Sequence, residues 1–135
     1  MEQVRVAGFA GITAAVFVLI LGSVPYLLGS PAAVSAYYTG APVGPPMVAL
    51  FAILEVIVLL AGLRRRSDPA TVAGIAVVLG LFAAVIAWWW AFTIEAALAG
   101  GVTQFDLFRN HRWAIAGAAS LQAIAGVMYG NAVLR

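Results

Sequence analysis

Four long apolar stretches alternate along the chain with short segments that are polar or rich in proline and glycine. The apolar stretches cover about residues 6–29, 46–63, 70–98 and 112–134. A helix rises about 1.5 Å per residue, so about 20 mostly apolar residues are needed to cross the hydrocarbon layer of a bilayer. The pattern therefore predicts an all-α fold, an integral membrane four-helix bundle in which residues 1–135 form a single transmembrane domain.

The three connections differ in character. The first, about residues 29–46, has four prolines and no charge, so we expect an irregular, non-helical loop. In the second, Asp68 suits a helix N-cap and Pro69 suits the first helical position, which predicts an antiparallel hairpin of the second and third spans. The third contains a box-like helix start at residues 103–106, so the fourth helix is expected to begin outside the lipid.

The arginines predict the orientation of the bundle. Arg64, Arg65 and Arg66 lie in the short second loop, and cytoplasmic loops carry the excess of positive charge. Because the number of spans is even, both termini are then cytoplasmic, and Arg109 and Arg112 lie outside. We expect a multi-pass protein of the cell membrane whose outer interface holds most of the amphipathic aromatic side chains: Tyr26, Tyr37, Tyr38, Trp88, Trp89, Trp90 and Trp113.

The composition excludes several classes of protein. Hydrophobic residues make up 64% and charged residues 9% of the chain, against roughly 45–50% and 25% in soluble domains. A net charge of +2 is too small for nucleic-acid binding. The absence of cysteine excludes disulfides and thiolate metal sites, and the absence of lysine excludes a Schiff base. Since no phosphate loop or nucleophile–base pair occurs, we expect no enzyme, no cofactor and no metal site.

Small residues recur at helical spacing within the spans. Helices in lipid gain little from the hydrophobic effect against one another, so close approach through small residues is their main attraction. Gly126 and Gly130 form a GxxxG pair in the fourth span. The third span has one seam of this kind: Ala73, Val77, Gly80, Ala84, Ala87, Ala91 and Glu95. Each seam serves either the internal bundle or a contact between copies, and internal packing is favoured.

Glu55 lies near the middle of the second span. On membrane-insertion scales, an acidic residue at this depth costs roughly 3 kcal/mol of insertion free energy. We therefore expect a protonated side chain that faces the bundle. Gln122 of the fourth span lies at similar depth and is the natural hydrogen-bond partner, with Thr13 as a further contact. A structural hydrogen bond is favoured, because the chain shows no second mid-membrane acid. The alternative is a site for a proton or a cation at Glu55 and Gln122.

A second polar cluster is expected at the outer end of the bundle. Glu95 faces the bundle at the level of Arg109 and Arg112, which favours an ion pair with one of these arginines. The alternative is a polar mouth of Glu95, Arg112 and His111 that opens outward. His111 is the only histidine, and we expect it to mark the water interface rather than to bind a haem or a metal.

Two segments carry a resemblance to a known group of proteins. Residues 67–74, SDPATVAG, precede a long Val/Leu/Ala helix, and Val24, Pro25 and Tyr26 form an earlier turn. Over about the first three spans the chain resembles small uncharacterised four-span membrane proteins of halophilic archaea. The resemblance implies a cell-membrane location and no particular activity. The basic loop of Arg64–Arg66 departs from that group, whose exposed segments tend to be acidic.

Two functions remain open from the sequence. The first is a non-enzymatic structural or accessory subunit that packs in a homo-oligomer or with another membrane protein. The alternative is a small proton- or cation-coupled transporter or channel that uses Glu55. The two differ in whether Glu55 borders a water-accessible cavity or is packed dry against Gln122. In both cases the lipid bilayer is the immediate partner.

Overall fold

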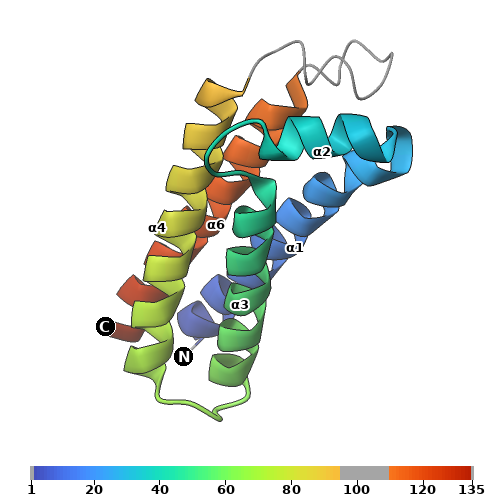
Figure 1. The fold of residues 1–135 in the computed structure, drawn as a ribbon. Coiled ribbons are helices and arrows are strands. Elements are labelled where there is room, and N and C mark those ends of the chain that lie inside the picture. Colours follow the sequence, from blue (N-terminus) through green and yellow to red (C-terminus); the bar gives the residue numbers. More distant parts are fainter. Residues whose placement is uncertain (1, 95–109, 135) are drawn as a thin grey trace.

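Four long helices form the bundle in a computed structural model, which describes residues 2–94 and 110–134 (Figure 1). The helices long and apolar enough to cross a membrane are α1 (Glu2–Leu28), α3 (Pro45–Leu63), α4 (Pro69–Thr93) and α6 (His111–Leu134). The described residues form helices, turns and bends without a strand. The predicted all-α architecture with four candidate membrane spans is therefore confirmed.

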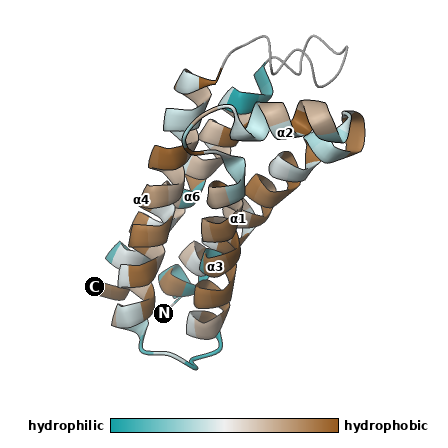
Figure 2. Ribbon diagram, viewed as in Figure 1, coloured by the Kyte–Doolittle hydropathy of each residue, from teal (hydrophilic) through white to brown (hydrophobic). Residues whose placement is uncertain are grey.

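The long helices are neighbours in the cyclic order α1, α3, α4 and α6. Extensive contacts join α1 to α3, α3 to α4, α4 to α6 and α6 to α1, whereas α3 and α6 face each other diagonally. Both chain ends lie at the same end of the bundle as the α3–α4 turn (Figure 1). Brown, apolar residues dominate the four long helices, and the α3–α4 turn is polar (Figure 2). The side of the membrane on which this turn lies stays a prediction.

The first connection contains a helix, so the predicted irregular loop is wrong. Helix α2 (Pro31–Thr39) lies across the end of the bundle opposite the chain termini (Figure 1). Its N-cap is Ser30, whose side chain accepts a hydrogen bond of 3.2 Å from the backbone N–H of Ala33. Pro31 occupies the first turn, where proline is favoured because the missing N–H has no helical partner there. The same proline that indicated a helix break instead begins a helix.

The α3–α4 hairpin forms as the sequence predicted. Asp68 is the N-cap of α4, and its Oδ2 accepts a hydrogen bond of 3.0 Å from the Thr71 backbone N–H. Pro69 is the first residue of the helix. A single short turn therefore places α3 and α4 side by side.

Small residues allow α4 and α6 to pack with their backbones in close contact. A Cβ atom built on Gly80 would lie 2.9 Å from the Cα of Ala123, and one on Gly126 would lie 2.9 Å from the carbonyl oxygen of Ala76. The predicted seam of the third span is the buried face at Ala73, Gly80, Ala87 and Ala91, whereas Val77 and Ala84 are only partly buried. Glu95, the last member of the predicted seam, lies outside the described residues.

Candidate functional site

Glu55 of α3 is completely buried inside the bundle, as its sequence position predicted. Its Oε1 lies 3.4 Å from the point where a Cβ on Gly126 of α6 would be, so the carboxyl reaches toward α6. Gln122, one helical turn before Gly126, is also fully buried. Glycine at position 126 leaves the space that the carboxyl group uses.

The carboxyl and amide groups of this pair are inaccessible to solvent, and no hydrogen bond of regular geometry joins them. Both carboxyl oxygens of Glu55 and both amide atoms of Gln122 are inaccessible to solvent and have no hydrogen-bond partner. The Gln122 amide is the group that faces the carboxyl. A protonated carboxyl has one donor and an amide has both donors and an acceptor, so the two side chains are able to satisfy each other after small rotations. Thr13 is not a partner, because it is exposed and its hydroxyl donates to the Phe9 carbonyl.

A second cluster of polar side chains surrounds Pro25 in α1. Pro25 lies inside the helix and has no N–H, so the carbonyl of Leu21 loses its usual partner four residues later. The Nε2 of His111 lies 2.6 Å from that carbonyl oxygen. A carbonyl only accepts, so Nε2 donates the hydrogen bond. The hydroxyl of Tyr38 donates to the next carbonyl, that of Gly22.

The same histidine joins α2 to α6. Its Nδ1 forms a hydrogen bond of 3.0 Å with the hydroxyl of Tyr37. With Nε2 donating, a neutral ring leaves Nδ1 to accept from that hydroxyl. Trp90 of α4 completes the connection by donating from Nε1 to the backbone carbonyl of Tyr37 at 3.1 Å. Three helices thus anchor α2: α1 through Tyr38, α6 through His111 and α4 through Trp90.

Several residues predicted at the outer interface are buried instead. Tyr37 and Trp90 have no exposed surface, Tyr38 is 3% exposed and His111 is 7% exposed. Helix α2 folds over the bundle end, so that its own Tyr37 and Tyr38 are buried there and contact Trp90 and His111. The alternation of polar and apolar residues did not show this. Burial raises the pKa of both Tyr37 and Tyr38 above the ordinary value. Trp88 and Trp89 are exposed, and their position at the membrane interface stays a prediction.

Arg112 binds the end of α4. Its guanidinium donates a hydrogen bond of 3.0 Å to the carbonyl of Ile94, where a cation is favoured by the free carbonyls of a helix C-terminus. The same group lies 5.0 Å from the centre of the Trp113 ring. Glu95 and Arg109 lie outside the described residues, so their ion pair with this region stays a prediction. Arg112 and His111 are neighbours in sequence but bind different helices.

Sequence reasoning missed the cluster around Pro25. The signal was present, because a proline inside a long apolar run leaves a carbonyl without a donor, and lipid supplies none. A side-chain donor from another helix was therefore to be expected. The sequence did not indicate which one, since Tyr38 and His111 are 16 and 90 residues away from the carbonyls that they bind.

Comparison with known proteins gives a family without an assigned role. A model described as a family of unknown function, DUF7548, matches residues 1–134. The chain belongs to this family. No curated protein and no solved structure matches it. The resemblance to membrane proteins of halophilic archaea stays a prediction.

Proposed function

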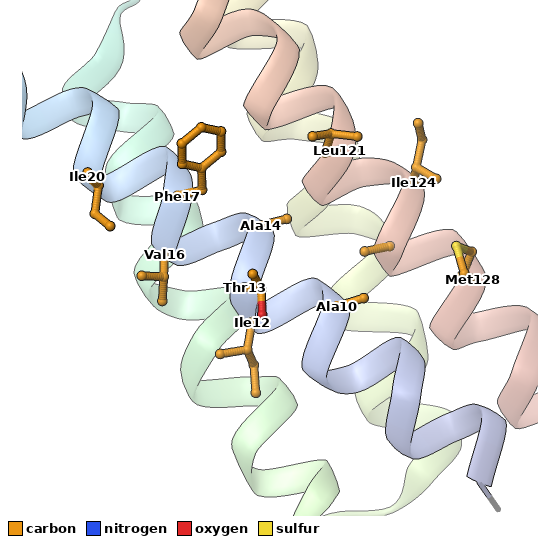
Figure 3. A pocket seen from close by; sticks show the side chains of 11 residues that line it. Ala10, Ile12, Thr13, Ala14, Val16, Phe17, Ile20, Leu121, Ile124 and Met128 are labelled. Carbon is orange, nitrogen blue, oxygen red and sulfur yellow. The ribbon is translucent and has the colours of Figure 1, made fainter.

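We propose that this member of the DUF7548 family is a non-enzymatic accessory subunit that packs laterally against another helix in the membrane. The observation that supports this most is a groove of about 740 Å³ between α1 and α6 (Figure 3). Small residues lie between larger apolar side chains in this groove: Ala10, Ala14 and Ala125 on one hand, and Phe17, Ile20, Leu121, Ile124 and Met128 on the other.

The shape of the groove, rather than its apolar character, supports a helix as its occupant. Apolar side chains face lipid on every membrane protein and indicate no partner by themselves. A floor of small residues between larger ones lets a second helix approach closely, which is what drives helix association in lipid. The hydroxyl of Thr13, the polar side chain in the lining, is already bonded to its own helix. The occupant is therefore expected to be apolar where it enters the groove.

A photocrosslinking experiment in native membranes tests this function. A photoreactive amino acid at Ile124, in the groove, should give protein adducts, whereas one at Ile57, on α3, should give lipid adducts. The two residues form a matched pair, because their exposed fractions are 56% and 57%. The mass of the adduct separates a second copy from a different protein. Equal yields of protein adducts at both positions would contradict a specific role for the groove.

A proton- or cation-coupled transporter is the second candidate. The unpartnered and fully buried carboxyl of Glu55 supports it, since such groups in membranes are often functional. The surroundings support it less, because Glu55 and Gln122 do not line the groove between α1 and α6. The Glu55→Gln variant separates the candidates. An accessory subunit should keep its groove adducts, whereas a transporter should lose pH-driven uptake in reconstituted vesicles while keeping its fold.

A further inference from the structure

The turn between α3 and α4 contains an arginine whose backbone has a conformation that residues other than glycine rarely adopt. Arg65 has a φ of 57°, the left-handed region. The backbone N–H of Arg66 donates to the carbonyl of Ala61 at 2.9 Å, and that of Arg65 donates to Gly62 at 3.1 Å. This is the closing turn that glycine usually occupies, because a Cβ is unfavourable there. The backbone conformation at this position is less favourable for arginine than for glycine. The presence of arginine here therefore indicates a role for its side chain.

Four arginines surround this end of the bundle. Arg64, Arg65 and Arg66 are consecutive and exposed. Arg5 of α1 is also exposed and lies at the same end, because Gly8, one turn later, packs against Leu63 at the end of α3. Among the described residues here, the carboxylates belong to Glu2 and Asp68. Asp68 is already engaged, since it accepts hydrogen bonds from both the N–H and the hydroxyl of Thr71.

The position of these arginines relative to the apolar helices indicates the chemistry that they meet. Leu60, in the last turn of α3, is exposed and apolar, and the arginines follow four residues later. A charge directly after a membrane-spanning segment lies at the depth of the lipid headgroups. Guanidinium groups bind phosphate with two parallel hydrogen bonds.

We propose that Arg5 and Arg64–Arg66 form a docking surface for the phosphate groups of anionic phospholipids. A small free anion fits this surface less well, because the backbone N–H groups of Arg65 and Arg66 already bind carbonyls of α3 and cannot cradle it. Exposed, independent side chains suit an array of headgroups. The lateral groove between α1 and α6 plays no part in this surface, so either assignment stands without the other.

The position with the left-handed backbone provides a sharp test. Full-length protein in an uncharged detergent is titrated with phosphatidylglycerol or with phosphatidylcholine, and the bound lipid is counted by native mass spectrometry. Tighter binding of phosphatidylglycerol is expected. The affinity of the Arg65→Gly variant for phosphatidylglycerol should be about fivefold lower, because one arginine near an anionic surface contributes about that factor to binding. The thermal unfolding temperature should stay equal or rise, because glycine suits the turn.

The control is Arg65→Lys, which keeps both the charge and the strained backbone but lacks the bidentate guanidinium, so its affinity for phosphatidylglycerol should fall less than that of Arg65→Gly. Equal affinity of Arg65→Gly and the original chain for phosphatidylglycerol would overturn the assignment. So would equal binding of the two lipids. Displacement of the bound lipid by millimolar inorganic phosphate would overturn it in favour of a site for free anions.

Discussion

Single glycines decide how closely two of the membrane helices approach. Gly80 meets the backbone of α6 at Ala123, and Gly126 meets the carbonyl of Ala76 on α4. In both cases the atom in the way belongs to the backbone, which cannot rotate aside as a side chain can. Glycine at these two positions is therefore required by packing and not by backbone conformation.

We expect Gly80→Ala to destabilise the bundle by about 1–3 kcal/mol, the usual effect of overpacking a core. Gly74→Ala is the matched control in the same helix, because a Cβ there has nothing within 4 Å. This control should be neutral or stabilising by up to about 1 kcal/mol, since alanine favours a helix over glycine. Unfolding in detergent measures both. Equal effects of the two substitutions would contradict the close contact at Gly80.

At the scale of an element, α1 depends on other helices at its proline. His111 of α6 donates to the Leu21 carbonyl that Pro25 leaves without a helical partner. His111→Ala should therefore cost about 1–3 kcal/mol, because a partly buried carbonyl loses its donor. In a Pro25→Ala background the loss should be smaller, since alanine at position 25 supplies the missing N–H. A double-mutant cycle measures the coupling, and strictly additive losses would show that the two residues act independently.

Helix α2 should respond to alkaline pH through its two buried tyrosines. Burial raises the pKa of Tyr37 and Tyr38 in the folded protein above the unfolded value of about 10. The unfolded chain then releases these protons first, so their contribution to stability is intact below about pH 10 and is lost as the pH rises through the folded pKa.

An alkaline titration followed by tyrosinate absorbance checks this behaviour. Tyr37 and Tyr38 should ionise only as the tertiary structure is lost. The Tyr37→Phe, Tyr38→Phe double variant should show a smaller late step, because these two hydroxyls are then missing while the buried Tyr129 remains. Ionisation of all tyrosines at about pH 10 in the folded protein would contradict the burial of the Tyr37 and Tyr38 rings between α2 and the bundle.

At the scale of the whole molecule, the two ends of the bundle differ in chemistry. One end has the chain termini and the basic α3–α4 turn, and the other has α2 over its buried aromatic cluster (Figure 1). The positive charge predicts that the first end faces the cytoplasm. Ser67 and Ser35 are exposed and mark the two ends.

Cysteine substitutions at these serines test the orientation. In intact cells a membrane-impermeant thiol reagent should label Ser35→Cys and leave Ser67→Cys unlabelled. Inverted vesicles should reverse the result. The chain has no native cysteine to interfere. Labelling of Ser67→Cys in intact cells would overturn the predicted topology.

The sequence alone determined the four spans, the α3–α4 hairpin and the inward direction of Glu55. These features follow from local rules: the length of apolar runs, the Asp68–Pro69 helix start, and the cost of placing a mid-span carboxyl in lipid. Each depends on one segment and its solvent, so no knowledge of the other helices is needed. Helical spacing also predicted the face of α4 that packs against the bundle. It did not predict that Val77 and Ala84 on this face are only partly buried.

The tertiary structure alone decided how side chains are arranged at the end of the bundle where α2 lies. Whether Trp90 and Tyr37 lie at the interface or in the core depends on where α2 folds. Both are buried because α2 packs against the end of the bundle with Tyr37 against Trp90. Which donor reaches the Leu21 carbonyl likewise depends on the arrangement of α1 and α6. Lipid leaves such groups no alternative partner, so the donor has to come from another helix, and only the packing of the helices determines which residue it is.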